Sequence, residues 1–357
     1  MSEKAFNFSP SALPVLIGSL PHRDHGEATD LVFSYTPEIP LWVQLPCYPE
    51  ERLLSQFSTG LPGLRGQGDN LFIETGGAAF ERELLAFYEQ YLSVSEGSAP
   101  LEGSIFAFTP ETGKGFSVFL EKALALDPPP LALKGQITGP FTMLTGLKDA
   151  SGRILHFHPE LRDTVVKALA MKARYQVEAM RSVADTAILF LDEPGISGFG
   201  TSSLVGIPRE EVVEELNEVM DAVHQAGGLA GIHVCANTDW SLVLSTPIDI
   251  LSFDAYGFFD RIVLFRDELL RFLEKGKVIA WGIVPTMNAS DILAEDAMGL
   301  VDRWRGYVRE LGADPELATR QALITPSCGT GLLSIELCTR VLSLTRKVSD
   351  LIRKDVL

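Results

Sequence analysis

The sequence contains little cysteine, little histidine and no excess of positive charge. Four cysteines and six histidines occur among its 357 residues. So few cysteines argue against a disulfide-stapled scaffold and indicate a reducing compartment. Lysine and arginine total 30 against 47 aspartate and glutamate residues, which gives a net charge of −17. A chain this acidic, with no run of basic residues, repels a phosphate backbone, and we expect no nucleic-acid partner.

The sequence also lacks long apolar runs. No segment approaches the roughly 18 uninterrupted apolar residues of a membrane span, and the N-terminal MSEKAFNFSP has no secretory signal pattern. We therefore expect a cytoplasmic protein with no membrane partner. Hydrophobic residues make up 46% of the chain and charged residues 22%, a balance that is typical of a folded globular enzyme.

Short apolar runs alternate with helical patterns along most of the chain. The candidate strands lie in VLIGSLP, LWVQLP, LALKGQITGP, AILFLDEPG, LAGIHVCAN, DILSFDAYG, KVIAWGIVPT and ALITPSCGTG. A helix or an insertion follows each of these strands, and this pattern predicts an α/β fold of the (β/α)8 TIM-barrel type, formed by a single domain over 1–357. An open doubly wound sheet is the alternative.

The segment 47–130 interrupts this alternation. It contains FIETGG, a helix-like FERELLAFYEQYL and the proline cluster DPPP. Its turn-forming residues predict an elaborated insertion after the second strand, and not a separate domain.

Polar residues gather where the predicted strands end. In a TIM barrel the active site lies at the C-terminal ends of the strands. The polar and glycine residues at these ends are Gly18 and Ser19 on the first strand, Gln44 on the second, Asp192 and Glu193 on the fourth, His233 and Cys235 on the fifth, Asp254 on the sixth and Cys328 on the eighth. These residues are therefore the candidates for a functional site.

His233 and Cys235 stand two residues apart in an apolar strand, so their side chains share one face. A barrel brings Cys328 of the last strand across the mouth towards them. Imidazole and thiolate ligands together suit Zn²⁺, and three protein ligands with one open position are typical of catalytic zinc. The alternatives are residues that simply pack in the core, or a Cys–His nucleophile pair, which the spacing disfavours.

Five segments of the chain resemble one family. IGSLP at 17–21, LDEPG at 191–195, HVCANT at 233–238, ILSFDA at 250–255 and PSCGTG at 326–331 look, in that order, like the catalytic barrel of cobalamin-independent methionine synthase. HVCANT and PSCG also resemble the methylcobalamin:coenzyme M methyltransferases of the uroporphyrinogen-decarboxylase superfamily. The resemblance implies a zinc-dependent methyltransferase whose acceptor is a thiol, with homocysteine and its product methionine favoured over coenzyme M.

The resemblance also implies a set of metal ligands. His233, Cys235 and Cys328 would hold zinc, which activates the thiol of the substrate. The family's glutamate falls at Asp254, where the spacing is a few residues shorter and the side chain is one methylene shorter. Asp254 is therefore the candidate for the fourth ligand.

The resemblance further implies how the amino acid binds. Ile17, Gly18 and Ser19 would receive its carboxylate, and Asp192 would pair with its ammonium group; Asp192 and Asp254 are thus the candidate catalytic acids. A Gly-Ser turn exposes amide donors to an anion, and an acid at another strand end offers a counter-charge. The alternatives are a simple turn at Ser19 and a helix cap at Asp192 or Glu193. Gln44 and His22 are candidates for the pocket wall only.

The other histidines and cysteines carry weaker signals. His156 and His158 have metal-ligand spacing, but they precede Pro159, and we expect a solvated loop there. We expect His224 at the surface of an amphipathic helix, and Cys47 and Cys338 as packing residues. The glycine-rich segment 195–206 is either a mobile lid or a passive loop.

Two rival functions and the methyl donor stay open at this point. A tetrapyrrole decarboxylase would need a cationic cavity, for which Arg23 is the only obvious candidate, and a non-catalytic zinc- or corrinoid-binding accessory protein would need no turnover. We expect a methylated corrinoid, held by a partner protein, as the donor. Folate-using synthases carry a second N-terminal barrel, whereas this chain begins its first strand within about fifteen residues. The net charge of −17 also disfavours a polyanionic folate.

Overall fold

The computed structural model describes residues 8–354 and shows an α/β protein built on a curled parallel sheet, as the sequence predicts. In the described residues this sheet has seven strands in the order β1-β9-β8-β7-β6-β5-β4. The strands are β1 (Leu13–Pro14), β4 (Leu133–Thr138), β5 (Ala187–Asp192), β6 (Leu229–Val234), β7 (Ile250–Phe253), β8 (Val278–Val284) and β9 (Ala322–Pro326).

The segment 41–44 lies between the two edges of this sheet. Leu41 forms a parallel bridge with Lys134 of β4, and Gln44 forms one with Ser19, just after β1. Gln44 N donates a hydrogen bond to Gly18 O, and Lys134 N donates one to Pro40 O. The segment therefore occupies the place of the second strand in a (β/α)8 order, held by isolated bridges and not by a regular strand.

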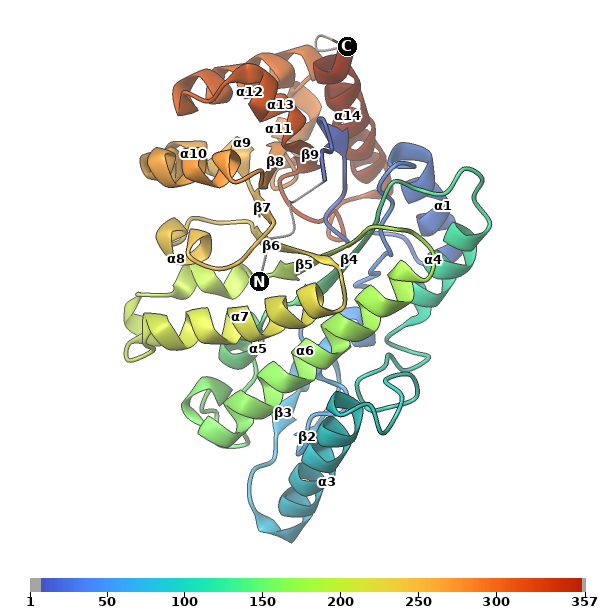
Figure 1. Ribbon diagram of the computed structural model, residues 1–357, viewed down its shortest axis with the longest axis vertical. Helices are drawn as coiled ribbons and strands as arrows, with labels where there is room; N and C mark the ends of the chain where they lie inside the picture. Colours follow the sequence, from blue (N-terminus) through green and yellow to red (C-terminus); the bar gives the residue numbers. More distant parts are fainter. Residues whose placement is uncertain (1–7, 355–357) are drawn as a thin grey trace.

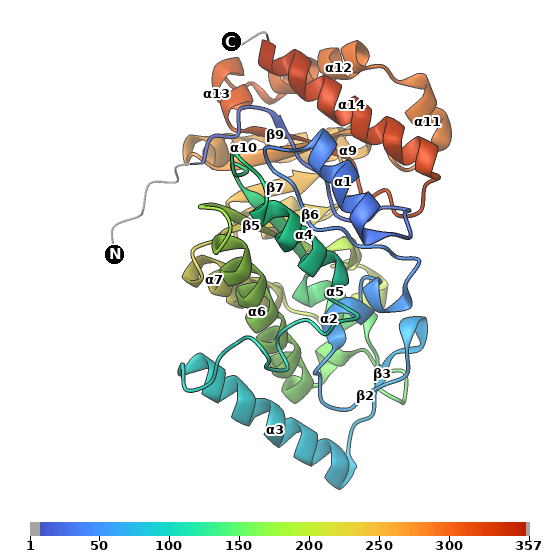
Figure 2. The ribbon, with the colours of Figure 1, turned by 90° about the vertical axis from the view of Figure 1, so that its right-hand side faces the viewer.

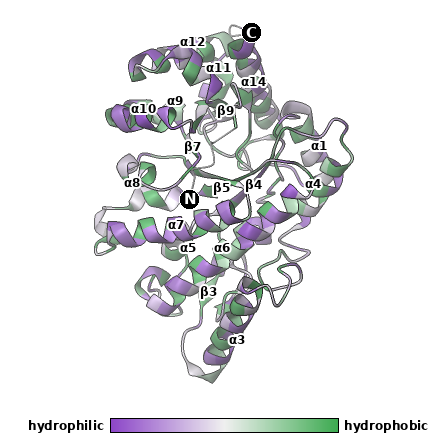
Figure 3. Cartoon of the chain, viewed as in Figure 1, coloured by the Kyte–Doolittle hydropathy of each residue, from purple (hydrophilic) through white to green (hydrophobic). Residues whose placement is uncertain are grey.

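Helices cover the outside of the sheet (Figures 1 and 2). The longer ones are α1 (His25–Tyr35), α4 (Lys114–Leu124), α6 (Pro159–Arg181), α7 (Arg209–Gln225), α9 (Ala255–Ile262), α10 (Arg266–Glu274), α12 (Ala297–Leu311) and α14 (Ile335–Lys354). Shorter ones are α5 (Pro140–Gly146), α8 (Trp240–Leu244), α11 (Ala289–Ala294) and α13 (Pro315–Arg320). In α7, Val212, Leu216, Val219 and Val223 are buried at helical spacing. Figure 3 shows hydrophilic and hydrophobic residues alternating along the helices.

Two layers of apolar side chains hold the sheet. In β5, alternate residues belong to different clusters: Leu189 and Leu191 pack with the helices, whereas Ile188 and Phe190 pack with residues of β1, β7, β8 and β9. Because successive side chains of a strand point to opposite faces, the second cluster fills the inside of the curled sheet. Polar residues beyond this inner cluster must therefore line the end of the sheet where the strands finish.

The segment 47–130 carries its own short elements. They are α2 (Ser55–Ser58), the antiparallel pair β2 (Leu64–Arg65) and β3 (Phe72–Ile73), and α3 (Gly77–Ser95), followed by α4. Figure 2 shows α3 at the opposite end of the molecule from α14. That this segment is an insertion, and that 1–357 form a single domain, stay predictions. Among residues 8–354, no helix is both long enough and apolar enough to cross a membrane.

Candidate metal centre and adjoining cavity

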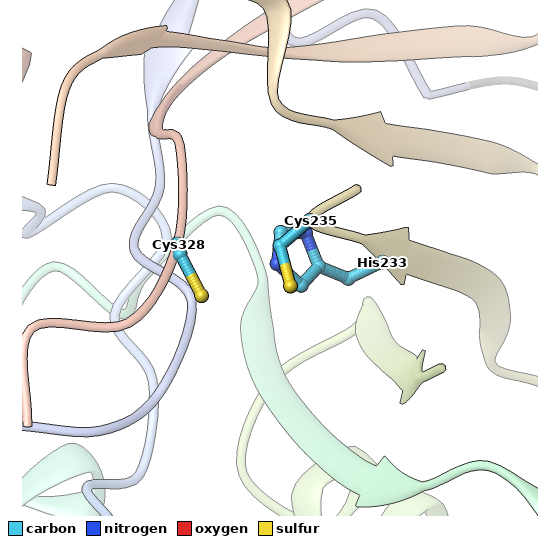
Figure 4. Close-up of side chains that lie close together, drawn as sticks. All are labelled: His233, Cys235 and Cys328. Carbon is cyan, nitrogen blue, oxygen red and sulfur yellow. The ribbon is translucent and has the colours of Figure 1, made fainter. Parts of the chain in front are cut away.

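The structure brings His233, Cys235 and Cys328 together. One ligand atom from each side chain lies within 4.8 Å of the others. His233 and Cys235 come from the end of β6, and Cys328 comes from the chain that follows β9 (Figure 4). Strands β6 and β9 are separated in the sheet by β7 and β8, so the curl of the sheet produces this meeting.

The ring of His233 is held from one side. Its Nδ1 lies 2.9 Å from Oγ of Ser252 on β7, and this contact is buried. Its Nε2 is also buried and has no hydrogen-bond partner. A buried nitrogen without a partner is costly, whereas a metal-binding histidine usually has its other ring nitrogen held by a hydrogen bond. The orphaned Nε2 therefore fits a metal ligand.

The sulfur atoms of Cys235 and Cys328 lie within 4.8 Å of each other. The neighbouring Cys328 thiol, together with the His233 ring, lowers the pKa of Cys235. The same interaction with Cys235, and burial, raise the pKa of Cys328. One sulfur is thus favoured as a thiolate, the form that binds metal. One imidazole nitrogen and two sulfurs make a donor set that suits Zn²⁺.

Asp254 lies close to this group but is not part of it. It is the N-cap of α9, and its Oδ1 accepts a hydrogen bond of 2.8 Å from Gly257 N. Burial raises the pKa of Asp254 to about 6, and His233 opposes this shift. The carboxylate has a local capping role already, and its assignment as the fourth ligand stays a prediction.

A cavity of about 680 Å³ opens beside the three ligands. All the predicted metal and substrate residues except Asp254 line it, namely Ile17, Gly18, Ser19, Gln44, Asp192, His233, Cys235 and Cys328. His22, predicted for the pocket wall, is not among the described residues that line the cavity. The strand ends thus converge on one space, as a barrel predicts.

The turn at Gly18 and Ser19 lines this cavity and has backbone amides without a backbone acceptor. Gly18 O accepts a hydrogen bond from Gln44 N, and Ser19 O accepts one from Thr330 N. Among residues 8–354, no backbone carbonyl accepts a hydrogen bond from the N–H of Gly18 or of Ser19. A Cβ at Gly18 would lie 2.8 Å from Oε1 of Gln44, so a larger residue there would require the Gln44 side chain to move. Free amides in such a turn can bind an anion.

The chain after β9 packs tightly on the same turn. Thr330 donates hydrogen bonds from both N and Oγ1 to Ser19 O. A Cβ at Gly329 would lie only 2.2 Å from Oγ of Ser19, so this close approach requires glycine. The contact places Cys328 and Ser19, which are 309 positions apart in the sequence, on one cavity.

Asp192 and Glu193 have different environments at the end of β5. Oδ1 of Asp192 is buried and has no hydrogen-bond partner, and burial raises the pKa of this carboxyl to about 6. Glu193 instead accepts hydrogen bonds from Phe141 N and from N and Oγ1 of Thr142. Glu193 therefore anchors the start of α5, and only Asp192 faces the cavity.

Sequence reasoning missed Glu51, Lys134 and Ser252. Glu51 lines the cavity from within the segment 47–130 and pairs with buried His25 at 2.6 Å. Lys134 is fully buried inside the sheet. Ser252 is the only polar residue of β7, and its place beside His233 in the register could have revealed it.

The prediction of a solvated loop at His156 and His158 is wrong for His156. Its ring is 3% exposed, and its Nε2 lies 3.2 Å from Oε1 of Glu215 on α7. Nε2 of His158 lies 2.8 Å from Oδ2 of Asp149. The packing of α7 against α6 covers this loop, an effect that the local sequence does not reveal.

The remaining residues singled out in the sequence lie outside the candidate metal centre. The side chain of His224, expected at the surface, is half-buried, and its Nε2 lies 2.8 Å from Oδ2 of Asp249. Cys338 is buried beside Thr330, as expected for a packing residue, whereas the expectation is wrong for Cys47, which is exposed. The glycine-rich segment forms the 3-10 turns η4 (Pro194–Gly198) and η5 (Ser202–Leu204), and its role as a lid stays a prediction.

Comparisons with known proteins find a shared fold. No family model matches the chain, and no curated protein matches its sequence. A B12-independent methionine synthase from Shewanella sp. W3-18-1, solved in complex with selenomethionine, is 15% identical with a TM-score of 0.57, over 97% of this chain and 99% of that chain. A protein assigned as a vitamin-B12-independent methionine synthase from Listeria monocytogenes is 11% identical with a TM-score of 0.55, over 97% and 99% of the two chains. The resemblance predicted from five short segments is thus confirmed at the level of the fold.

Proposed function

We propose that the protein transfers a methyl group to the sulfur of homocysteine or of a close amino-acid thiol. The observation that carries this proposal is the cavity itself. The soft metal ligands line the same cavity as the buried carboxylate of Asp192, which is near enough to His233 and Cys235 to interact with them electrostatically, and as the turn at Gly18 and Ser19. Homocysteine carries a thiol at one end and an ammonium and a carboxylate group at the other, so it can use all of these groups of the cavity. The shared fold with methionine synthases supports the same reading.

We propose zinc as the cofactor because the residues fit it. His233, Cys235 and Cys328 would hold the ion, and the orphaned Nε2 of His233 would gain the partner that it lacks. Zinc bound there lowers the pKa of a coordinated thiol, so that the sulfur is nucleophilic near neutral pH. Asp254 would supply a fourth ligand through Oδ2, because its Oδ1 accepts the hydrogen bond from Gly257 N.

The chain's own residues position the acceptor. The amides of Gly18 and Ser19 bind its carboxylate, and Asp192 binds its ammonium group, which directs the thiol towards the sulfur side of the cavity. Ser252 holds the ring of His233 in one orientation. In the reaction the substrate sulfur, having lost its proton to solvent, forms a bond to the methyl carbon while the bond between that carbon and the donor breaks.

We propose a methylated corrinoid, presented by a partner protein, as the donor. The cavity is open, and Met287 and Leu332 on its lining are 70% and 98% exposed, an apolar rim on which a large ligand can rest. Both methionine synthase structures are matched over 99% of their chains, so those chains have about the same length as this one. The length of the chain therefore does not by itself identify the donor. The donor therefore has to be decided by assay.

The rival decarboxylase receives little support from the cavity. A tetrapyrrole with several carboxylates requires several cations, but among the described lining residues Arg52 is the only lysine or arginine. Nη1 of Arg52 already lies 2.5 Å from Oδ2 of Asp69. Arg23, the candidate from the sequence, is not part of the lining. An accessory protein without turnover is distinguished from an enzyme by assay alone.

The test compares acceptor thiols on the zinc-loaded full-length chain. With methylcobalamin as donor, we expect methylation of homocysteine to exceed that of coenzyme M. Asp192→Asn should raise the KM for homocysteine by about tenfold or more while the zinc content stays the same, because the ammonium group loses a charged partner. Equal or better turnover with coenzyme M would contradict the proposal, and no turnover with any thiol would favour the accessory protein.

A further inference from the structure

A lysine lies buried inside the curled sheet, next to the turn at Gly18 and Ser19. Lys134 is the second residue of β4 and has no exposed surface. Its Nζ donates a hydrogen bond to Ile17 O, lies 3.4 Å from Oε1 of Gln136, and sits 4.5 Å from the centre of the Phe190 ring. A buried ammonium group is costly unless such partners compensate it.

The carbonyl that Lys134 binds belongs to the peptide unit between Ile17 and Gly18. In a trans peptide the C=O and the N–H point in opposite directions. The ammonium group that holds Ile17 O inside the sheet therefore directs the Gly18 N–H the other way. Ile17 and Gly18 both line the cavity, and the Gly18 N–H has no backbone acceptor among residues 8–354.

The charge of Lys134 also affects the part of the cavity next to the Ile17–Gly18 peptide. Asp192 is close enough to interact with Lys134 electrostatically, and it lines the cavity. A buried cation beneath the cavity offsets the buried negative charge of this carboxylate, and it also favours an anion bound at the Gly18 and Ser19 amides. Lys134 does not itself line the cavity, so it acts through these residues.

We propose that Lys134 is a positioning residue that orients the Ile17–Gly18 peptide to receive the carboxylate of an amino-acid substrate. This inference rests on the proposed function, because it concerns the zwitterionic end of the same substrate. It makes a specific prediction: the loss of Lys134 impairs amino-acid thiols and spares thiols that have no carboxylate.

A second buried lysine supplies the matched control. Lys172 on α6 is 1% exposed, and its Nζ lies 3.3 Å from Oγ1 of Thr59 and 3.4 Å from Ile105 O, outside the curled sheet. Lys172→Met removes a buried ammonium group just as Lys134→Met does, but it leaves the cavity unchanged. Lys134→Gln serves as a second test variant, because its shorter side chain can contact Gln136 but cannot reach Ile17.

The experiment measures binding, metal and turnover in the zinc-loaded full chain. Calorimetry gives the affinity for homocysteine and methionine, metal analysis gives the zinc content, and kcat/KM is compared for homocysteine and 2-mercaptoethanol. For Lys134→Met we expect about 10-fold to 100-fold weaker amino-acid binding, the size of a lost charge-assisted hydrogen bond. Zinc content and kcat/KM for 2-mercaptoethanol should match those of Lys172→Met.

Each outcome has a defined meaning. If Lys134→Met and Lys134→Gln bind homocysteine as tightly as the wild type, or lose activity equally on both thiols, Lys134 is only structural and the inference is overturned. The same holds if Lys172→Met shows an equal loss of binding. If the wild-type protein itself binds neither homocysteine nor methionine, the proposed function fails first, and this inference falls with it.

Discussion

The orientation of one imidazole ring decides what the cluster at the end of β6 can bind. Ser252 occupies Nδ1 of His233, so the buried Nε2, which has no hydrogen-bond partner, is the nitrogen left to bind a metal. Ser252 stands directly opposite His233 in the register between β6 and β7. If His233 binds zinc as we propose, this hydroxyl would be the outer partner of a metal ligand, a role that commonly affects metal affinity strongly.

The three inner residues should bind about one zinc ion per chain. We expect Cys235→Ser and Cys328→Ser each to lower zinc affinity by more than the roughly 10-fold to 100-fold that outer partners contribute. Cys338→Ser is the matched control, because Cys338 is also buried but packs beside Thr330 outside the cluster. Metal analysis after dialysis against a chelator gives the result, and full zinc occupancy in the Cys235→Ser, Cys328→Ser double variant would contradict the assignment.

The outer partner can be tested separately from the ligands. Ser252→Ala should leave the three ligands in place but free the ring of His233 to rotate, and we expect a fall in zinc affinity of about 10-fold to 100-fold. Competition with a fluorescent zinc chelator measures this change. Ser241→Ala on α8 is a suitable comparison, because its hydroxyl contacts only Asp239 and Arg209 away from the cavity. Equal zinc affinity of Ser252→Ala and the wild type would mean that Ser252 does not orient the ring.

At the scale of elements, buried carboxylates fix the chain between strands and helices. Glu193 holds the start of α5 against the end of β5. Asp149 does the same for the loop before α6: its Oδ1 accepts hydrogen bonds from N and Oγ of Ser151 and from Arg153 N. Its Oδ2 faces Nε2 of His158. These contacts hold the chain at the start of α5 and in the loop before α6.

Asp149 makes stability depend on pH in a defined direction. Its hydrogen bonds, first those from Ser151, lower the pKa of Asp149 from 3.8 to about 2. A folded-state pKa below the unfolded one stabilises the fold above pH 3.8 and loses this effect as the pH falls towards 2. Asp149→Asn should thus lower the thermal midpoint at pH 7 relative to wild type, and the difference should shrink on acidification. Asp260→Asn, at an exposed site, is the control. If Asp149→Asn lowered the thermal midpoint by the same amount at pH 7 and at pH 3, this account would be refuted.

At the scale of the whole molecule, the sequence predicts what local patterns determine. Strands such as β5 and β6 read as apolar runs because both of their faces are buried. The strand predicted at 41–46 forms only bridges, and the prolines at 40 and 46 that flank the bridged residues have no N–H with which to extend a ladder. The burial of Lys134 depends on a carbonyl 117 positions away, which no local pattern contains. Side chains at strand ends were therefore found from the sequence, and their supporting partners were not.

The charge of the whole chain bears on the methyl donor. A net charge of −17 repels an anionic ligand, and each glutamate added to a folate tail increases this repulsion unless a basic patch receives it. Within the described residues Arg52 is the one basic residue that lines the cavity, and it is paired with Asp69. We therefore expect the zinc-loaded protein to form methionine from homocysteine and methylcobalamin, and to form little from methyltetrahydrofolate whether it carries one glutamate or three. Methionine should be quantified by mass spectrometry at low and at high salt. Salt screens the repulsion between the protein and the folate, so it should affect methionine formation from the folate but not from methylcobalamin. Efficient turnover with the folate, improved by the longer tail, together with none from methylcobalamin, would show that the donor is a folate and that a local basic site outweighs the overall charge.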